Sequence, residues 1–301
     1  MAAFDYDAII VGSGPAGLTA GSQLARSGQR VLVLERDVYG GALQHVDRIE
    51  DYGAYPEGIT GADLASALLD QATGAGVALD QAEVNGVEVF SRSRWVACSD
   101  GRGFSCGVVI LAGGARFQSL GLPAETRLRG RGVIDCTPCD AGFYDGKSVV
   151  VVGSGEYAMR DAQHLARMGA RVTLLADSES LGADSGTALD GIDVRYAARV
   201  EAIVGDERLA SVVFSDGATH EVAADGIAVR IGIEPNTDWL ADLVELDTQR
   251  RIPVNQDAET EARFVLAAGD IRSGTPHTVT SAVNDGERAA ARALHLLRHP
   301  G

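Results

Sequence analysis

Two stretches of the chain share one pattern of apolar and polar positions. Each starts with an apolar run and passes through a glycine-rich turn. A segment with apolar residues at helical spacing follows, and then a second apolar run; the stretches start at Ala8 and Val149. A buried strand, a glycine turn, an amphipathic helix and a second strand form the opening unit of a doubly wound sheet. The pattern therefore predicts two nucleotide-binding folds.

The two stretches are in register. Gly153 minus Gly12 gives an offset of 141 residues. Identical residues then coincide at several positions, among them Gly12/Gly153, Gly14/Gly155, Leu24/Leu165, Arg26/Arg167, Gly28/Gly169, Val31/Val172 and Leu34/Leu175. A single glycine triplet is weak evidence for a nucleotide site, whereas two complete units in register favour a repeated fold.

The first copy carries every residue of the dinucleotide fingerprint. Gly12 permits the tight turn, Gly14 lets the backbone approach a pyrophosphate, and Gly17 lets the helix pack on the strand. Glu35 lies 23 residues after Gly12, at the end of the second predicted strand, where a carboxylate can accept bonds from ribose hydroxyls. We expect this copy to bind a dinucleotide.

The second copy is incomplete. Ala158 stands at the third glycine position, which is a tolerated change, and Ala176 stands at the position of Glu35, with Asp177 next to it. A working nucleotide site and a structural relic both remain open for this copy.

Outside the repeat, alternating patterns predict further strands. Residues 95–114 and 209–232 each indicate a β-hairpin followed by a buried strand. Residues 264–271 indicate a strand that ends at a glycine and an aspartate, and residues 281–297 indicate a closing helix. This last strand and helix are typical of the end of a dinucleotide-binding domain.

The predicted fold class is α/β, with two three-layer Rossmann-like domains and the second inserted into the first. We expect residues 1–116 and 242–301 to form one dinucleotide-binding domain, into which residues 117–241 are inserted as a second domain.

Composition excludes several classes of protein. The chain has 301 residues, of which 46% are hydrophobic, and a net charge of −16, which argues against a nucleic-acid partner. It starts without a basic segment before its first apolar run, so no signal peptide is predicted. No apolar run reaches the ~18 residues that span a bilayer. We expect a soluble, cytoplasmic protein without membrane contact.

The four cysteines fall into two groups. Cys98 and Cys106 are eight residues apart across a predicted hairpin, and we interpret them as buried side chains. Cys136 and Cys139 have the spacing of a reversible disulfide, and no second short-spaced pair completes a zinc site, so no metal is expected. Asp140 follows directly and can exchange a proton as thiol and thiolate interconvert. We predict a redox-active pair.

With these residues in view, the chain resembles the low-molecular-weight thioredoxin reductases, which are FAD-dependent pyridine nucleotide-disulfide oxidoreductases, along essentially its whole length. The matching landmarks are GSGPAG (12–17), GGALQ (40–44), YPEGITG (55–61), LAGGA (111–115), CTPCD (136–140), GSGEYA (153–158), IGIEPNT (231–237) and AAGDI (267–271).

The resemblance implies specific roles. Cys139 would face the flavin, Cys136 would exchange with the substrate disulfide, and Asp140 would donate a proton. The protein would be a homodimer that binds FAD. Residues 1–116 and 242–301 would form the FAD-binding domain, and residues 117–241 would form a nicotinamide-type domain that carries the cysteine pair. The residues implied to contact FAD are Gly12, Ser13, Gly14, Ala16, Gly17, Glu35, Arg36, Gly41, Leu43, Gln44, Asp51, Val84, Gly113, Gly269, Asp270, His277, Thr278 and Val279.

The chain departs from this family where NADPH would bind. A His-Arg-Arg stretch and a further arginine hold the 2′-phosphate in the family, and an Arg-Gln pair precedes the last helix. Here those positions carry Ala176, Asp177, Ser178 and Gly182, and Pro276 and His277. A phosphate needs such arginines. We therefore expect NADPH to be a poor donor and NADH at best a weak one.

Three functions remain open. The first is an FAD-dependent dithiol/disulfide oxidoreductase acting on a thioredoxin-like protein or a small-molecule dithiol or disulfide, with ferredoxin among the candidate donors. The second is an oxidase that uses O2 to close a disulfide in a natural product. Such oxidases usually continue with Cys-His-Gly, whereas this chain has CDAG (139–142), which favours the reductase. The third is an FAD-binding redox sensor without turnover.

Overall fold

A computed structural model describes residues 4–182, 189–240 and 242–299. The chain divides into two compact units, which are described separately below. The first unit comprises Met1–Arg116 and Glu234–Gly301, and the second comprises Phe117–Ile233.

The return from the second unit to the first comes earlier than the sequence suggested. The sequence predicts a boundary between residues 241 and 242, but the division falls after Ile233. Residue 241 itself lies outside the described residues. The reason is local bonding within the first unit. The backbone N–H of Asn236 donates to the carbonyl of Gly114 at 3.0 Å, and its side chain donates to the carbonyl of Gly113 at 2.8 Å. Leu240 is buried in the core of the first unit.

The first unit is built on one mixed sheet. Its strand order is β3-β2-β1-β6-β5-β4, and β16 pairs with β6 as well. The strands are β1 (Tyr6–Val11), β2 (Val31–Glu35), β3 (Ala78–Gln81), β4 (Val84–Val89), β5 (Arg94–Cys98), β6 (Gly103–Leu111) and β16 (Val265–Ala267). Pairing among β3, β2, β1, β6 and β16 is parallel, whereas β4, β5 and β6 pair antiparallel. The parallel part has the arrangement of a dinucleotide-binding domain.

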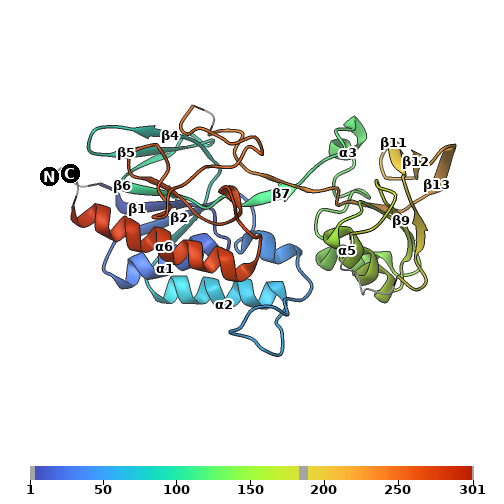
Figure 1. Cartoon of the computed structure of the whole chain (residues 1–301), viewed down its shortest axis with the longest axis horizontal. Coiled ribbons are helices and arrows are strands. Elements are labelled where there is room, and N and C mark those ends of the chain that lie inside the picture. The colour runs from blue at the N-terminus through green and yellow to red at the C-terminus, as the bar shows by residue number, and fades with distance from the viewer. Residues whose placement is uncertain (1–3, 183–188, 241, 300–301) are drawn as a thin grey trace. The chain divides into compact units, whose positions relative to one another are not determined.

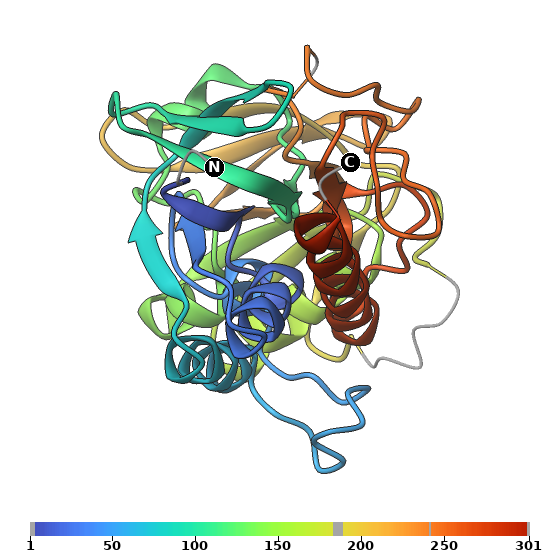
Figure 2. The same ribbon diagram turned by 90° about the vertical axis from the view of Figure 1, so that its left-hand side faces the viewer.

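Alternate residues of strand β1 face two separate hydrophobic cores, one on each side of the sheet. Ile10 belongs to a cluster with helices α1 (Pro15–Arg26), α2 (Gly61–Gly74) and α6 (Val279–Arg298), and these helices cover one face of the sheet (Figure 1). Ile9 belongs to a cluster with the β4–β5 hairpin and the segment that follows the strand β15 (Ile233–Pro235). Helices α1 and α6 lie side by side (Figure 2). The three predicted layers are present because the apolar run of β1 is buried on both faces.

The second unit repeats this design with fewer strands. A parallel sheet has the order β10-β9-β8-β14, and an antiparallel sheet has the order β11-β12-β13. The strands are β8 (Ser148–Val152), β9 (Arg171–Leu175), β10 (Asp193–Arg195), β11 (Arg199–Val204), β12 (Ser211–Ser215), β13 (Thr219–Ala223) and β14 (Gly226–Val229). Helix α5 (Glu156–Arg167) follows β8 as α1 follows β1, and a short helix α3 (Pro123–Arg127) precedes the cysteine pair.

Two short strands carry the chain between the units. They are β7 (Ala115–Phe117) on the way out and β15 (Ile233–Pro235) on the way back, and they pair in a two-stranded sheet. The two Rossmann-like folds expected from the repeat are therefore present, and the second is inserted into the first.

Candidate active site

Cys136 and Cys139 form a disulfide with their Cα atoms 5.3 Å apart. Cys136 is the N-cap of the short helix α4 (Thr137–Asp140), and its sulfur accepts a hydrogen bond from the backbone N–H of Cys139 at 3.3 Å. Cys139 is exposed and Cys136 is half-buried. A second thiol can therefore reach this bond, as thiol–disulfide exchange requires.

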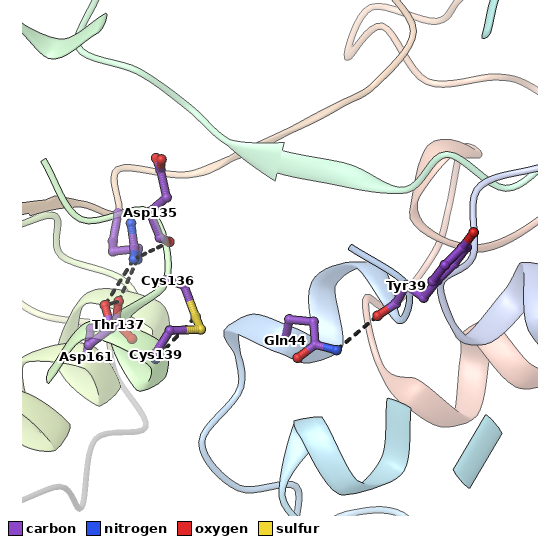
Figure 3. The surroundings of a disulfide bond; sticks show 8 residues. Tyr39, Gln44, Asp135, Cys136, Thr137, Cys139 and Asp161 are labelled. Carbon is purple, nitrogen blue, oxygen red and sulfur yellow. Dashed lines mark hydrogen bonds and ion pairs between the residues drawn. A yellow bond between two sulfur atoms is a disulfide. The ribbon is translucent and has the colours of Figure 1, made fainter. Parts of the chain in front are cut away.

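A buried polar network supports the loop that carries the disulfide. The side chain of Arg230 donates to the carboxylate of Asp161 at 2.6 Å, and from Nη2 to the carbonyl of Asp135 and the hydroxyl of Thr137, both at 3.1 Å. The Thr137 hydroxyl donates to the same Asp161 oxygen at 2.5 Å. Figure 3 shows Asp135, Thr137 and Asp161 gathered beside the disulfide. The residues before and after Cys136 are thus bonded to one guanidinium group.

The sequence pattern did not single out this network. Arg230 ends the apolar run of β14, and a charged residue there signals a buried partner without identifying it. Its partner Asp161 lies 69 residues earlier, on helix α5, so only the tertiary structure brings the two together.

Asp140 ends helix α4 directly after Cys139. Burial raises the pKa of its carboxyl group above the ordinary value, and the negative charge of Asp135 raises it further. A carboxyl group with a raised pKa holds its proton at higher pH and can deliver it to a departing thiolate. The position and this shift suit the predicted proton donor.

The other two cysteines are buried, as expected. Cys98 is 4% exposed and Cys106 is 0% exposed, on the adjacent strands β5 and β6. Burial raises the pKa of the Cys106 thiol to about 12, so it remains protonated near neutral pH.

The glycine turn of the first unit leaves room for a ligand. Gly12 has φ +104°, and a Cβ atom there would lie 2.4 Å from the carbonyl oxygen of Ala112. A Cβ atom on Gly17 would lie 2.0 Å from the carbonyl oxygen of Gly12, so helix and turn are in close contact. A Cβ atom on Gly14 would meet nothing within 4 Å. Gly14 is the N-cap of α1, so unpaired N–H groups lie beside this open space.

Glu35 bonds to this turn from the end of β2. Its Oε2 accepts bonds from the N–H and the hydroxyl of Ser13 at 2.8 and 2.7 Å, and its Oε1 accepts one from the N–H of Asp37 at 3.0 Å. A carboxylate has about four acceptor positions, so one remains for a ribose hydroxyl. The residues present therefore fit the dinucleotide that the sequence predicts.

Four further predicted contacts lie beside the same turn. A Cβ atom on Gly41 would lie 3.3 Å from the Cα atom of Gly14, and one on Gly12 would lie 3.0 Å from the Cα atom of Gly113. A Cβ atom on Gly269 would lie 3.0 Å from the Cβ atom of Ala16. Gly41, Gly113, Ala16 and Gly269 therefore come together with the fingerprint.

The predicted contacts on β2, β4 and the following loops are more dispersed. The short helix η1 (Gly41–His45) carries Leu43, which is buried, and Gln44, whose amide donates to the carbonyl of Tyr39 at 2.9 Å (Figure 3). Arg36 is exposed and pairs with Asp37 at 3.0 Å.

Two others on this part of the chain have different settings. Val84 is buried in the core, which leaves its backbone as the part able to contact a cofactor. Asp51 is exposed in the loop closed by the Ile49–Ile59 bridge, and none of the contacts above includes it.

The last predicted contacts surround the start of α6. Asp270 lies in the short helix η3 (Gly269–Ile271), with its Oδ1 3.3 Å from Nδ1 of His277, although that nitrogen lacks the geometry of a hydrogen bond. His277 has φ +59°, an unusual backbone conformation for a non-glycine residue. Thr278 caps α6 and Val279 is its first residue.

The second unit has an equivalent glycine turn, at Gly153 and Gly155, but the residues around it differ. A Cβ atom on Gly155 would meet nothing within 4 Å, and one on Gly153 would lie 2.2 Å from the carbonyl oxygen of Arg230. Oδ1 of Asp177 accepts a bond from the hydroxyl of Ser154 at 2.5 Å, as Glu35 does from Ser13. The one-residue offset of Asp177 therefore does not keep its carboxylate from the turn.

The loop after β9 also closes on this turn. The N–H of Ser178 donates to the hydroxyl of Ser154 at 3.1 Å, and the N–H of Gly182 donates to its carbonyl at 3.0 Å. Glu156, on the first turn of α5, pairs with Arg160 at 2.8 Å. The residues described above as bonded to Ser154 are Asp177, Ser178 and Gly182, whereas a 2′-phosphate would require arginines.

Over the described part of the chain, no helix combines the length and apolar character needed to cross a membrane.

The chain is similar in sequence and structure to proteins of one known family. The model of the pyridine nucleotide-disulphide oxidoreductase family matches residues 6–286. The chain is 34% identical to the thioredoxin reductase of Treponema pallidum, over 97% of each chain. Its structure is similar to that of Lactococcus lactis thioredoxin reductase, with a TM-score of 0.89, 31% identity and coverage of 98% and 99%. It is also similar to a ferredoxin-flavin thioredoxin reductase from Clostridium acetobutylicum, with a TM-score of 0.54, 27% identity and coverage of 97% and 98%.

Proposed function

The chain belongs to the pyridine nucleotide-disulphide oxidoreductase family, and we propose that it passes electrons between FAD, the Cys136–Cys139 pair and a dithiol or disulfide substrate, without NADPH as an efficient donor. The resemblance to thioredoxin reductases is confirmed, and the chain is a thioredoxin reductase-like oxidoreductase. We propose the identities of the cofactor, the electron donor and the substrate, and the residues of the site, on the grounds given below.

The observation that carries the proposal is the accessible disulfide followed by a carboxyl group with a raised pKa. In the reducing direction, the Cys136 thiolate attacks the substrate disulfide and forms a mixed disulfide. Cys139 then attacks Cys136, which restores the protein disulfide and releases the substrate as a dithiol. Asp140 supplies a proton to the departing thiolate. Two electrons leave the protein pair, and bound FAD supplies the two-electron chemistry that returns them.

We assign FAD to the first unit because its turn is open over Gly14 and Glu35 retains an acceptor position. The residues that would hold it are those beside that turn, namely Gly12, Ser13, Gly14, Ala16, Gly17, Glu35, Gly41, Gly113 and Gly269, with Asp270 near the start of α6. We also propose that the protein acts as a homodimer, as the resemblance implied.

The proposal that NADPH is a poor electron donor rests on the residues around the glycine turn of the second unit. Asp177 occupies the place where a 2′-phosphate would be bound, and Glu179 follows two residues later. A phosphate with about two negative charges would be repelled there. NADH avoids that repulsion, but Glu156 adds negative charge beside the phosphate turn, so we propose that it is a weak donor. The likeness to a ferredoxin-flavin thioredoxin reductase favours a reduced ferredoxin, or a dithiol acting through Cys139.

Anaerobic stopped-flow mixing tests the donor. We expect a dithiol to bleach the flavin readily, NADPH to bleach it very slowly, and Cys139→Ser to abolish bleaching by the dithiol. Fast bleaching by micromolar NADPH would overturn the donor assignment. Stoichiometric peroxide during aerobic dithiol turnover would identify the O2-using oxidase, and the absence of multiple turnovers with any dithiol or disulfide would leave a redox sensor.

A further inference from the structure

One arginine bonds to both neighbours of Cys136, to the backbone of one and to the side chain of the other. Nη2 of Arg230 donates to the carbonyl of Asp135 and to the hydroxyl of Thr137, both at 3.1 Å. Because a guanidinium group is planar and its donors have fixed directions, these two bonds restrict the positions of both neighbours of Cys136 together.

The arginine is itself fixed by the core of the second unit. Its Nε lies 2.6 Å from Asp161, and the two side chains are only 3% and 14% exposed. Nη1 donates to the carbonyl of Val229 at 2.8 Å, and the guanidinium carbon lies 4.1 Å from the centre of the Phe117 ring. A buried ion pair with this many bonds has little freedom, because separating it would leave an unpaired buried charge. The loop is thus attached to a rigid support.

We propose that Arg230, with Asp161 and Thr137, is a positioning group that sets the equilibrium between the disulfide and dithiol forms of the Cys136–Cys139 pair. This inference rests on the proposed function, in which the pair cycles between the two forms. In exchange with glutathione, the protein disulfide and two glutathione thiols give the protein dithiol and glutathione disulfide, with two electrons and two protons transferred.

The direction of the effect follows from loop entropy. Closing the disulfide removes freedom from residues 136–139, and a loop that is already held at Asp135 and Thr137 in the dithiol form has less freedom to lose. The network therefore favours the disulfide. Releasing the loop should lower the equilibrium constant for disulfide formation against glutathione about tenfold, which corresponds to a potential about 30 mV less negative.

The test compares variants in defined glutathione buffers, with free thiols trapped by a maleimide and counted by mass. Arg230→Met combined with Asp161→Asn removes the pair without leaving a buried charge. Thr137→Val removes one hydroxyl, and Thr137→Ser restores it. The matched control is Arg94→Met, which removes a buried arginine of the first unit that also bonds carbonyl groups and lies 4.2 Å from the ring of Phe264.

We expect the double variant and Thr137→Val to shift the equilibrium about tenfold. Thr137→Ser and Arg94→Met should stay within about twofold of the parent, since they leave the network of Arg230, Asp161 and Thr137 intact. Thermal unfolding identifies the variants that fold, and the valine–serine pair decides the matter if the double variant does not. Equal constants for Thr137→Val and Thr137→Ser would overturn the inference alone. A parent pair that no dithiol buffer can reduce would overturn the proposed function as well.

Discussion

Glu35→Ala should weaken FAD binding about 10- to 150-fold. The carboxylate bonds to Ser13 and Asp37 and retains about one acceptor position for a ribose hydroxyl. A hydrogen bond to a charged group contributes about 1.5–3 kcal/mol, and each 1.4 kcal/mol is about a tenfold change in Kd. The variant also leaves the N–H of the buried Ser13 without its acceptor, so the apoprotein should lose about 1–3 kcal/mol of stability.

Asp177→Ala is the matched control for this prediction. It removes the equivalent carboxylate from the equivalent serine, Ser154, in the second unit. Titration of each apoprotein with FAD, followed by quenching of flavin fluorescence, gives the two Kd values. Thermal unfolding of each apoprotein, without FAD, reports stability separately. An unchanged Kd for Glu35→Ala, or an equal loss of FAD by Asp177→Ala, would refute the assignment of FAD to the first turn.

Three further predictions concern the cysteines and Asp140. Cys136→Ser should leave a Cys139 thiolate that gives a long-wavelength charge-transfer band with the flavin, whereas Cys139→Ser should trap substrate as a mixed disulfide without reducing the flavin; equal, mild effects would indicate a structural pair. Asp140→Asn should slow turnover more than it weakens FAD binding. Because folding raises the pKa of Asp140 above 3.8, the stability of the protein falls as pH rises from 3.8 through the raised pKa. Asp140→Asn should therefore melt at a higher temperature than the parent at pH 7 but not at pH 3. An unchanged melting temperature at pH 7 would contradict this. The reduced native protein should react with two equivalents of maleimide at pH 8 and four in denaturant, because Cys98 and Cys106 are buried and burial raises the pKa of both thiols. The Cys106 thiol, with a pKa of about 12, is about one part in 10⁴ thiolate at pH 8, and labelling of all four thiols in the native protein would contradict this.

The fold could be predicted largely because the features that identify it are steric limits on residues that lie close together in the sequence. A Cβ atom on Gly12 or Gly17 would meet backbone atoms at 2.4 and 2.0 Å, so the glycine spacing itself identifies the turn in the first unit. The disulfide pair was visible for a similar reason, since two intervening residues allow the bond. The return to the first unit was placed too late because Asn236 and Leu240 belong to that unit through contacts with segments far away in the chain.

The network of Arg230, Asp161 and Thr137 beside the disulfide was not predictable from residue spacing in the sequence. It joins the cysteine loop, helix α5 and the end of β14, and Asp161 and Arg230 are 69 residues apart. Each of its members has an ordinary interpretation by itself: an aspartate within a helix, a threonine at the start of a short helix, or an arginine directly after a strand. Only the tertiary structure connects them, because an arginine that is 3% exposed requires partners for its charge and its donors.

The contact between Ser154 and Asp177 has a structural role in the second unit that is separate from nucleotide binding. In both units a serine within the glycine turn donates its hydroxyl to a carboxylate at the end of the second strand. In the second unit the same hydroxyl also accepts the N–H of Ser178, so the contact holds the loop after β9 against the turn. Such a contact stabilises the turn whether or not a nucleotide is bound. Its presence is therefore no evidence for a pyridine nucleotide, and the proposal that NADPH is a poor donor rests instead on the carboxylate of Asp177, which stands where a 2′-phosphate would need arginines.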